Sequence, residues 1–172
     1  MASSAPELTP RAREIVAAAR ELLEAEGPEA LSMRRVADRI GIRAPSIYKH
    51  LPDKQALEAA LITAGFEEWA EAFEGEEGAE ALARAYRGYA KAHPHLYRLM
   101  TERPLARDRL APGVEERAAA PIVRAVGGDP DVARAVWAFA HGMAILELNG
   151  RFPPDADLDA AWTVGMARII GA

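Results

Sequence analysis

The chain has 172 residues, half of them hydrophobic and only 6% aromatic, and its formal net charge at pH 7 is −5. The absence of cysteine excludes a disulfide framework, a thiolate metal site and a cysteine nucleophile. The N-terminal stretch has no secretory-signal pattern, and no apolar run approaches the roughly 18 residues of a membrane span. A cytoplasmic protein of one or two small domains is therefore expected.

The first predicted helix spans residues 10–26. Thr9 is suited to cap it, Pro10 fits its first position, and Gly27 with Pro28 ends it. Its spaced apolar residues predict a packing role. Residues 1–8 are expected to form a mobile tail.

Residues 31–54 are predicted to form a helix-turn-helix. Ser32 is a good cap for a first helix, and Gly41 can end that helix in the left-handed conformation that glycine tolerates. Pro45 suits the first turn of a short second helix, predicted to run from Pro45 to His50 and to be stopped by Pro52. Two short helices joined by a glycine-containing turn are typical of a DNA-reading unit.

The same stretch is basic within an acidic chain. Residues 31–54 hold six basic and two acidic side chains, a net charge of +4 (6 − 2). Residues 55–172 hold twelve basic and eighteen acidic side chains, a net charge of −6 (12 − 18). A local positive patch is the electrostatic footprint of a nucleic-acid-binding module. The alternative is a small solvated helical hairpin without a partner.

The predicted second helix leaves a polar surface. Ile47 and Leu51 are four residues apart and are expected to face the core. This leaves Ser46 and the run 48–50 toward solvent, with hydroxyl, phenol, ammonium and imidazole groups that suit phosphate oxygens and base edges.

The run from Gly41 to Leu57 resembles the DNA-binding signature of the TetR (tetracycline-repressor) family, which is a turn, a short recognition helix carrying Tyr-x-His-Phe/Leu, and a Lys before the next helix. The upstream run 30–37 is similar to the family's hydrophobic–Ser/Thr–x–x–x–hydrophobic–Ala pattern, and the resemblance covers about residues 10–60. Lys49 departs from it, because the family often has an aromatic residue there. The resemblance implies contact with a double-stranded DNA operator through Ser32, Arg34, Arg43, Ala44, Pro45, Ser46, Tyr48, Lys49, His50 and Lys54.

The rest of the chain is also predicted to be helical. The expected helices span residues 53–73, 79–92, 94–101, 113–126, 130–148 and a last one ending near residue 170, capped by Asp155 or Asp157. Residues 102–112 are expected to form an exposed, mobile connection. An all-α fold of about nine helices follows, with a DNA-binding domain over residues 1–54, a shared link helix over 53–73, and a ligand-binding and dimerisation domain over 55–172.

The last two helices are predicted to pair with their copies in a homodimer. They are apolar on more than one face and carry small residues that permit close packing. TetR relatives use their last two helices in this way, and the alternative is the core of a monomer. The run 137–142 also resembles the Trp–His–Gly subtype of the family's C-terminal domain. The expected interface residues are Phe139, Leu146, Trp162, Met166 and Ile169.

The TetR resemblance also implies a cavity for a small apolar effector. Aromatic and methionine side chains suit such a ligand, although ordinary core packing is the better explanation for any single one of them. The candidate lining residues are Phe66, Trp69, Tyr86, Tyr89, Tyr97, Met100, Trp137, His141 and Met143.

The resulting hypothesis is a homodimeric repressor that binds a palindromic operator and is released by a small apolar ligand. The alternatives are a DNA-binding regulator without an inducer and, less favoured, a helical carrier or enzyme. The sequence contains no recognisable catalytic constellation and predicts no cofactor. His93 and His95 are two residues apart but are not expected to bind a metal.

Overall fold

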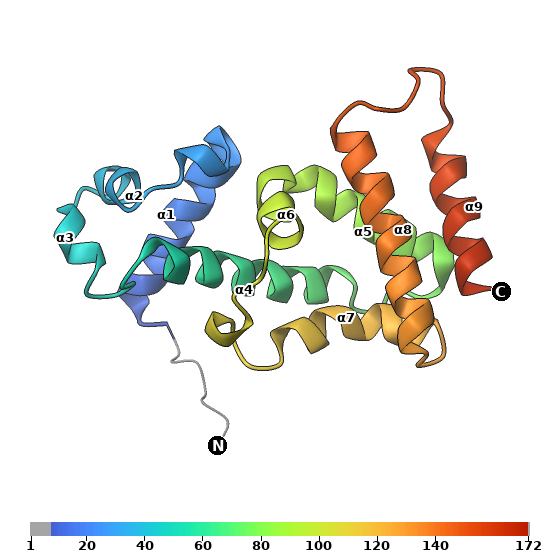
Figure 1. The fold of residues 1–172 in the computed structure, drawn as a ribbon, viewed down its shortest axis with the longest axis horizontal. Helices are drawn as coiled ribbons and strands as arrows, with labels where there is room; N and C mark the ends of the chain where they lie inside the picture. Colours follow the sequence, from blue (N-terminus) through green and yellow to red (C-terminus); the bar gives the residue numbers. More distant parts are fainter. Residues whose placement is uncertain (1–7, 172) are drawn as a thin grey trace. The chain divides into compact units, whose positions relative to one another are not determined.

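The computed structural model describes residues 8–171, and over this range the chain is helical with no strand (Figure 1). All but the last residue of the tail expected over residues 1–8 lies outside the described residues. The predicted all-α fold is confirmed. No helix among the described residues is both long and apolar enough to cross a membrane.

The helices largely follow the predicted segments. In chain order they are α1 (Pro10–Glu26), η1 (Pro28–Ala30), α2 (Met33–Arg39), α3 (Ala44–Ile47), α4 (Lys54–Ala72), α5 (Gly78–Ala92), α6 (Pro94–Thr101), η2 (Arg107–Arg109), α7 (Val114–Ala125), α8 (Pro130–Leu148) and α9 (Leu158–Ile170), where η marks a 3₁₀ turn.

Side-chain caps begin several of these helices. Thr9 Oγ1 accepts a hydrogen bond from the Ala12 amide at 3.2 Å, and Pro10 occupies the first turn of α1. Asp157, rather than Asp155, caps α9, because its Oδ1 accepts the Ala160 amide at 2.9 Å. Each bond satisfies an amide that the helix itself leaves unpaired.

The chain forms two compact units, described separately below. Unit 1 contains residues up to Glu67 together with His93–Val114, and unit 2 contains Glu68–Ala92 together with Glu115 onward. The link helix α4 begins in unit 1 and ends in unit 2.

Unit 1 is built around α1, α2, α3, the first part of α4, and α6. Its core includes Ile15, Leu23 and Val36, each fully buried. The N-terminus of α6 is held by α1, since the Glu24 carboxylate accepts the amides of His95 at 3.3 Å and Leu96 at 3.1 Å.

α4 and α6 cross closely at Gly65. A Cβ at this glycine would lie 2.6 Å from the Met100 sulfur and 2.9 Å from Leu96 Cδ2. Any larger residue at this position would have to displace the Met100 and Leu96 side chains.

The connection between α6 and α7 is fastened along α4 and is less free than the sequence analysis expected. Leu110 is only 6% exposed, and the Ala111 amide donates to Thr63 Oγ1 on α4 at 3.3 Å. Arg109 pairs with Asp53 at the start of α4. Most of the segment is exposed, as predicted. The contacts to α4 were missed because their partners lie 48 to 56 residues away, outside any local pattern.

Unit 2 packs α5 against α8 and α9, which also pack against each other. Trp69 lies at the centre of an aromatic cluster, stacked on Phe73 with ring centroids 5.1 Å apart and edge-on to Tyr86 at 4.7 Å and Tyr89 at 5.0 Å. Tyr86 also approaches Trp162 of α9 at 6.0 Å. Such edge-to-face and stacked pairs add stability beyond their buried area.

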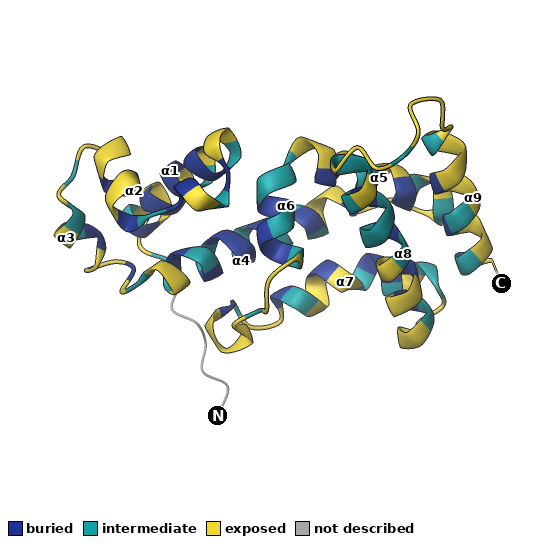
Figure 2. Ribbon diagram, turned by 45° about the horizontal axis from the view of Figure 1, so that its top comes forward, coloured by how far each residue is buried: buried dark blue, intermediate teal, exposed yellow. Residues whose placement is uncertain are grey.

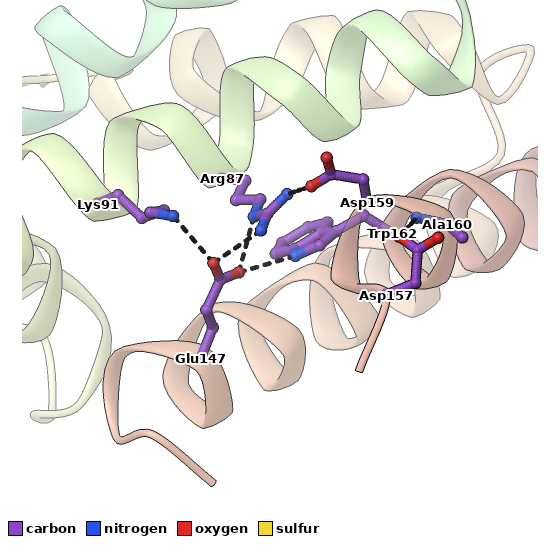
Figure 3. Close-up of polar contacts among 7 residues, drawn as sticks. All are labelled: Arg87, Lys91, Glu147, Asp157, Asp159, Ala160 and Trp162. Carbon is purple, nitrogen blue, oxygen red and sulfur yellow. Dashed lines mark hydrogen bonds and ion pairs between the residues drawn. The ribbon is translucent and has the colours of Figure 1, made fainter. Parts of the chain in front are cut away.

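A polar network joins α5, α8 and α9 (Figure 3). The Glu147 carboxylate on α8 accepts two hydrogen bonds from Arg87, at 2.7 and 2.9 Å, one from Lys91 at 3.1 Å and one from Trp162 Nε1 at 3.2 Å. Arg87 also pairs with Asp159 on α9. The network therefore ties the α8–α9 pair to α5.

Candidate nucleic-acid interface

The turn between α2 and α3 is built as the sequence suggests. The Ser32 hydroxyl accepts the Arg35 amide at 3.3 Å and caps α2. At the other end Gly41 adopts φ +68°, its amide donates to Asp38, and the Ile42 amide donates to Ala37. This pair of bonds is the Schellman motif, in which glycine supplies the left-handed residue.

The recognition helix is shorter than predicted. The sequence predicts a helix from Pro45 to His50, whereas α3 spans Ala44–Ile47 and turns follow it to His50. Beyond Ile47, the amides of His50 and Leu51 both donate to the Ile47 carbonyl. The His50 bond spans three residues. The helix ends early because this three-residue bond closes a turn tighter than that of an α-helix.

Core and surface divide as expected at the end of α3 and in the turn that follows it. Ile47 is fully buried and Leu51 is 4% exposed. Lys49 and His50 are exposed, and Tyr48 is 51% exposed although it is aromatic. An exposed polar run anchored by two buried apolar side chains is a rigid way to present groups to a groove.

Not all the basic residues of the segment remain available to a partner. Arg35 pairs with Glu26 at 2.6 Å and Arg39 with Glu21 at 2.9 Å, and both glutamates belong to α1. The count of +4 over residues 31–54 did not include these carboxylates. Two of the six positive charges of residues 31–54 are therefore offset by carboxylates of α1.

The remaining cations lie on the predicted contact surface. Arg34 is 87% exposed and only weakly paired with Asp38, at 4.0 Å. Lys54 lies 3.6 Å from Glu58. Arg43 and Lys49 form no ion pair among residues 8–171. The expected contacts Ala44, Pro45 and Ser46 lie on α3 itself.

Asp53 and Arg109 form a contact at the start of α4 that the sequence analysis missed. Arg109 Nη1 lies 2.9 and 3.0 Å from the two carboxylate oxygens of Asp53. The pKa of Asp53 is lowered by the hydrogen bond from the Ala56 amide and, next, by Arg109, so the group is ionised at neutral pH. No local signal identifies this pair, because its members are 56 residues apart.

The predicted ligand-pocket residues fall into three places. Trp69, Tyr86 and Tyr89 are buried together in the aromatic cluster of unit 2. Trp137 and His141 stack on each other along α8, 5.9 Å apart, and Trp137 is 45% exposed. Met143 is half-buried on α8, whereas Phe66, Tyr97 and Met100 belong to unit 1.

The predicted dimer residues divide by exposure. Trp162 and Met166 are 2% and 1% exposed, so within one chain they already belong to the core and offer no surface to a partner. Leu146 is 43% exposed, while Phe139 and Ile169 are half-buried. Val164, which the sequence analysis did not select, is 58% exposed (Figure 2 shows exposed residues along α8 and α9).

Comparison with known proteins agrees with this architecture. The model described as "Tetracyclin repressor-like, C-terminal domain" matches residues 79–169, and the model described as "Bacterial regulatory proteins, tetR family" matches residues 15–61. The narrower Trp–His–Gly subtype stays a prediction.

Two curated relatives are regulators of the same kind. The uncharacterised HTH-type transcriptional regulator Rv0681 of Mycobacterium tuberculosis is 29% identical, over 90% of this chain and 78% of its own length. The HTH-type transcriptional repressor DrrR1 of Streptomyces coeruleorubidus is 31% identical over 78% of this chain, although the match spans only 51% of DrrR1.

A solved structure shares the fold. A tetracycline-repressor variant from Acinetobacter baumannii AYE, crystallised with minocycline, has a TM-score of 0.66 and 23% identity, and the match covers 96% of each chain. The family models, the regulator relatives and the helix-turn-helix together show that this chain belongs to the TetR family and is a DNA-binding transcriptional regulator of the repressor type.

Proposed function

We propose that the protein acts in the bacterial cytoplasm as a homodimer that binds a palindromic operator and is released from it by a small apolar ligand. The observation that carries the proposal is the exposed run 48–50, held on a glycine-terminated helix-turn-helix by the buried side chains of Ile47 and Leu51. In this proposal residues 1–54 read DNA, and residues 55–172 dimerise and bind the ligand.

The proposed DNA contacts have separate roles. Lys49, Ser46 and Arg34 read base edges, because amine, hydroxyl and guanidinium groups donate to the acceptors of the major groove. Tyr48, His50 and Lys54 hold phosphates, which fixes register without reading sequence. All of these except Ser46 are exposed.

Dimerisation through α8 and α9 is supported by the apolar side chains that remain exposed there. Trp137, Leu146 and Val164 are 45%, 43% and 58% exposed, and over residues 8–171 they are three of the four large apolar residues that are exposed. A two-fold dimer would place two recognition segments about 34–36 Å apart, in successive major grooves.

An effector in the C-terminal half is supported by the aromatic side chains of α4 and α5. The comparison protein from Acinetobacter baumannii binds minocycline, and we extend to this chain only the class, a largely apolar small molecule. Release requires that the ligand bind the DNA-free state more tightly than the DNA-bound state. The rival is a regulator that binds DNA without any inducer.

Selection of genomic DNA fragments on the purified protein, at two salt concentrations, tests the DNA-binding mode. A palindrome that is enriched and binds less tightly at the higher salt supports the proposal, because each neutralised phosphate contributes to the salt dependence. A single half-site without symmetry would contradict dimeric binding. A screen of apolar compounds for a raised melting temperature then separates the ligand-responsive regulator from its rival.

A further inference from the structure

Two arginines of the α6–α7 connection reach the carboxylates on either side of Lys54. Arg109 Nη1 lies 2.9 Å from Asp53 Oδ1, one residue before Lys54. Arg103 Nη1 lies 3.5 Å from Glu58 Oε1, and Lys54 Nζ lies 3.6 Å from that same oxygen. Each carboxylate beside the lysine therefore has a cation of its own.

Arg109 is placed by the backbone that carries it, and Arg103 by a second ion pair. Arg109 belongs to η2, the next residue Leu110 is 6% exposed, and the Ala111 amide donates to Thr63 on α4. Arg103 has a second carboxylate within reach, since its Nη2 lies 3.6 Å from Glu29 Oε1. The guanidinium groups are thus supplied from a fastened segment and not from a free loop.

Folding stability is a weak explanation for these pairs. The side chains of Arg109 and Asp53 are 36% and 46% exposed, and those of Arg103 and Glu58 are 44% and 20% exposed. Ion pairs with this much solvent around them contribute little to stability.

The two arginines are expected to affect DNA affinity more than folding stability. Asp53 is ionised, since its pKa is lowered, and an uncompensated carboxylate beside a phosphate anchor repels the phosphate. Lys54 and Glu58 are one helical turn apart and form an ion pair. Without Arg103, Lys54 would be the only cation paired with Glu58, and the carboxylate would compete with a phosphate for it. An arginine on each carboxylate removes both penalties.

We propose that Arg109 and Arg103 are positioning residues for DNA binding, which neutralise Asp53 and Glu58 so that Lys54 can hold a phosphate, without touching DNA themselves. This inference rests on the proposed phosphate contact of Lys54. It predicts that the α6–α7 connection neutralises the carboxylates at the start of α4 and makes no contact with DNA.

The test measures operator affinity of the full-length protein across a series of salt concentrations. Arg109→Gln is expected to weaken binding about fivefold, the size of one unit-charge interaction at about 4 Å in water. Its slope of log affinity against log salt stays that of the wild type, because no phosphate contact is lost. Lys54→Gln also weakens binding, but it reduces the magnitude of the slope by about one.

Removal of the opposing carboxylate provides the decisive readout. Asp53→Asn removes the negative charge but retains a side chain that can cap α4. The double variant Asp53→Asn/Arg109→Gln is therefore expected to recover wild-type affinity. Glu58→Gln should rescue Arg103→Gln in the same way, and Arg109→Lys should keep most of the affinity. Arg84→Gln, which removes an exposed arginine paired with Glu80 at 2.8 Å on α5, is the matched control and should bind normally.

Three results would overturn the inference. A smaller salt slope for Arg109→Gln without rescue by Asp53→Asn would make Arg109 a direct phosphate contact. Unchanged affinity of Arg109→Gln beside a weakened Lys54→Gln would remove the inference and leave the proposed contact standing. Full affinity and slope in Lys54→Gln would remove both. Melting temperatures within about 3 °C of the wild type verify that the variants are folded.

Discussion

At the scale of single residues, Glu147 shows how an acidic side chain is kept charged among packed helices. Its partial burial opposes ionisation, but the hydrogen bonds from Arg87, Lys91 and Trp162 outweigh that effect and lower its pKa from 4.5 to about 2. Arg87 responds in the opposite sense, because its bond to Glu147 raises its own pKa. The four hydrogen bonds make this carboxylate the polar centre of unit 2.

The Glu147 network predicts a pH dependence of stability. A carboxylate whose folded pKa lies below its unfolded value stabilises the protein above pH 4.5 and loses that contribution as the pH falls toward 2. Glu147→Gln should therefore lower the free energy of unfolding at pH 7 by up to about 3 kcal/mol and flatten its decline in acid. Urea unfolding from pH 7 to pH 3 measures this, with Glu80→Gln at an exposed pair as control. Equal declines in both variants would argue against it.

The residues of the recognition segment predict two different DNA-binding phenotypes. Lys49→Ala should change which operator is preferred, because it removes a proposed base contact, with about 1–3 kcal/mol of discrimination lost at one position. Tyr48→Phe should weaken binding to all sequences alike, because it removes a proposed phosphate contact. Fragment selection repeated with each variant distinguishes the two. Wild-type behaviour in both variants would mean that the segment following Ile47 does not face DNA.

At the scale of helices, the crossing of α4 and α6 depends on the missing side chain of Gly65. A methyl group there would come within 3 Å of two side chains of α6. Gly65→Ala should therefore destabilise the protein by about 1–3 kcal/mol, the usual cost of overpacking. Thermal unfolding measures this.

Gly88 provides a matched control for that helix prediction. It also lies inside a helix, α5, but a Cβ there would meet nothing within 4 Å. Gly88→Ala should therefore raise stability by about 0.5–1 kcal/mol, since alanine is the better helix former. Stabilisation by both substitutions would show that α4 and α6 do not pack as closely as described.

At the scale of the whole molecule, the proposed assembly depends on the apolar surface of α8 and α9. Val164→Glu places a charge on a side chain that is 58% exposed in the single chain, so it should leave the fold intact and prevent dimerisation. Light scattering should then give the mass of a monomer, and operator affinity should fall with it. Ala17→Glu, at an exposed position of α1, is the control. A dimer of unchanged strength in Val164→Glu would place the interface elsewhere.

Helix positions were largely predictable from the sequence, because their signals act within one turn of the chain. Thr9 and Asp157 accept amides three residues away, and Gly41 adopts its left-handed conformation at the end of the segment it terminates. The helix-turn-helix and its buried anchor Ile47 follow from the same short-range rules. The one short helix that differed, α3, ends at Ile47, where a three-residue hydrogen bond closes a tighter turn.

Tertiary structure alone decided which side chains meet. Trp162 resembled an interface residue, but it is buried over α5 and donates to Glu147 from 15 residues away. The charge count of the sequence treats Arg35 and Arg39 as free charges, whereas in the structure they pair with carboxylates of α1. Arg109 lies in a segment that the sequence predicts to be a loop, but in the structure it pairs with Asp53. Caps and turns are settled by neighbours along the chain, whereas burial and charge pairing depend on distances in space that no local pattern contains.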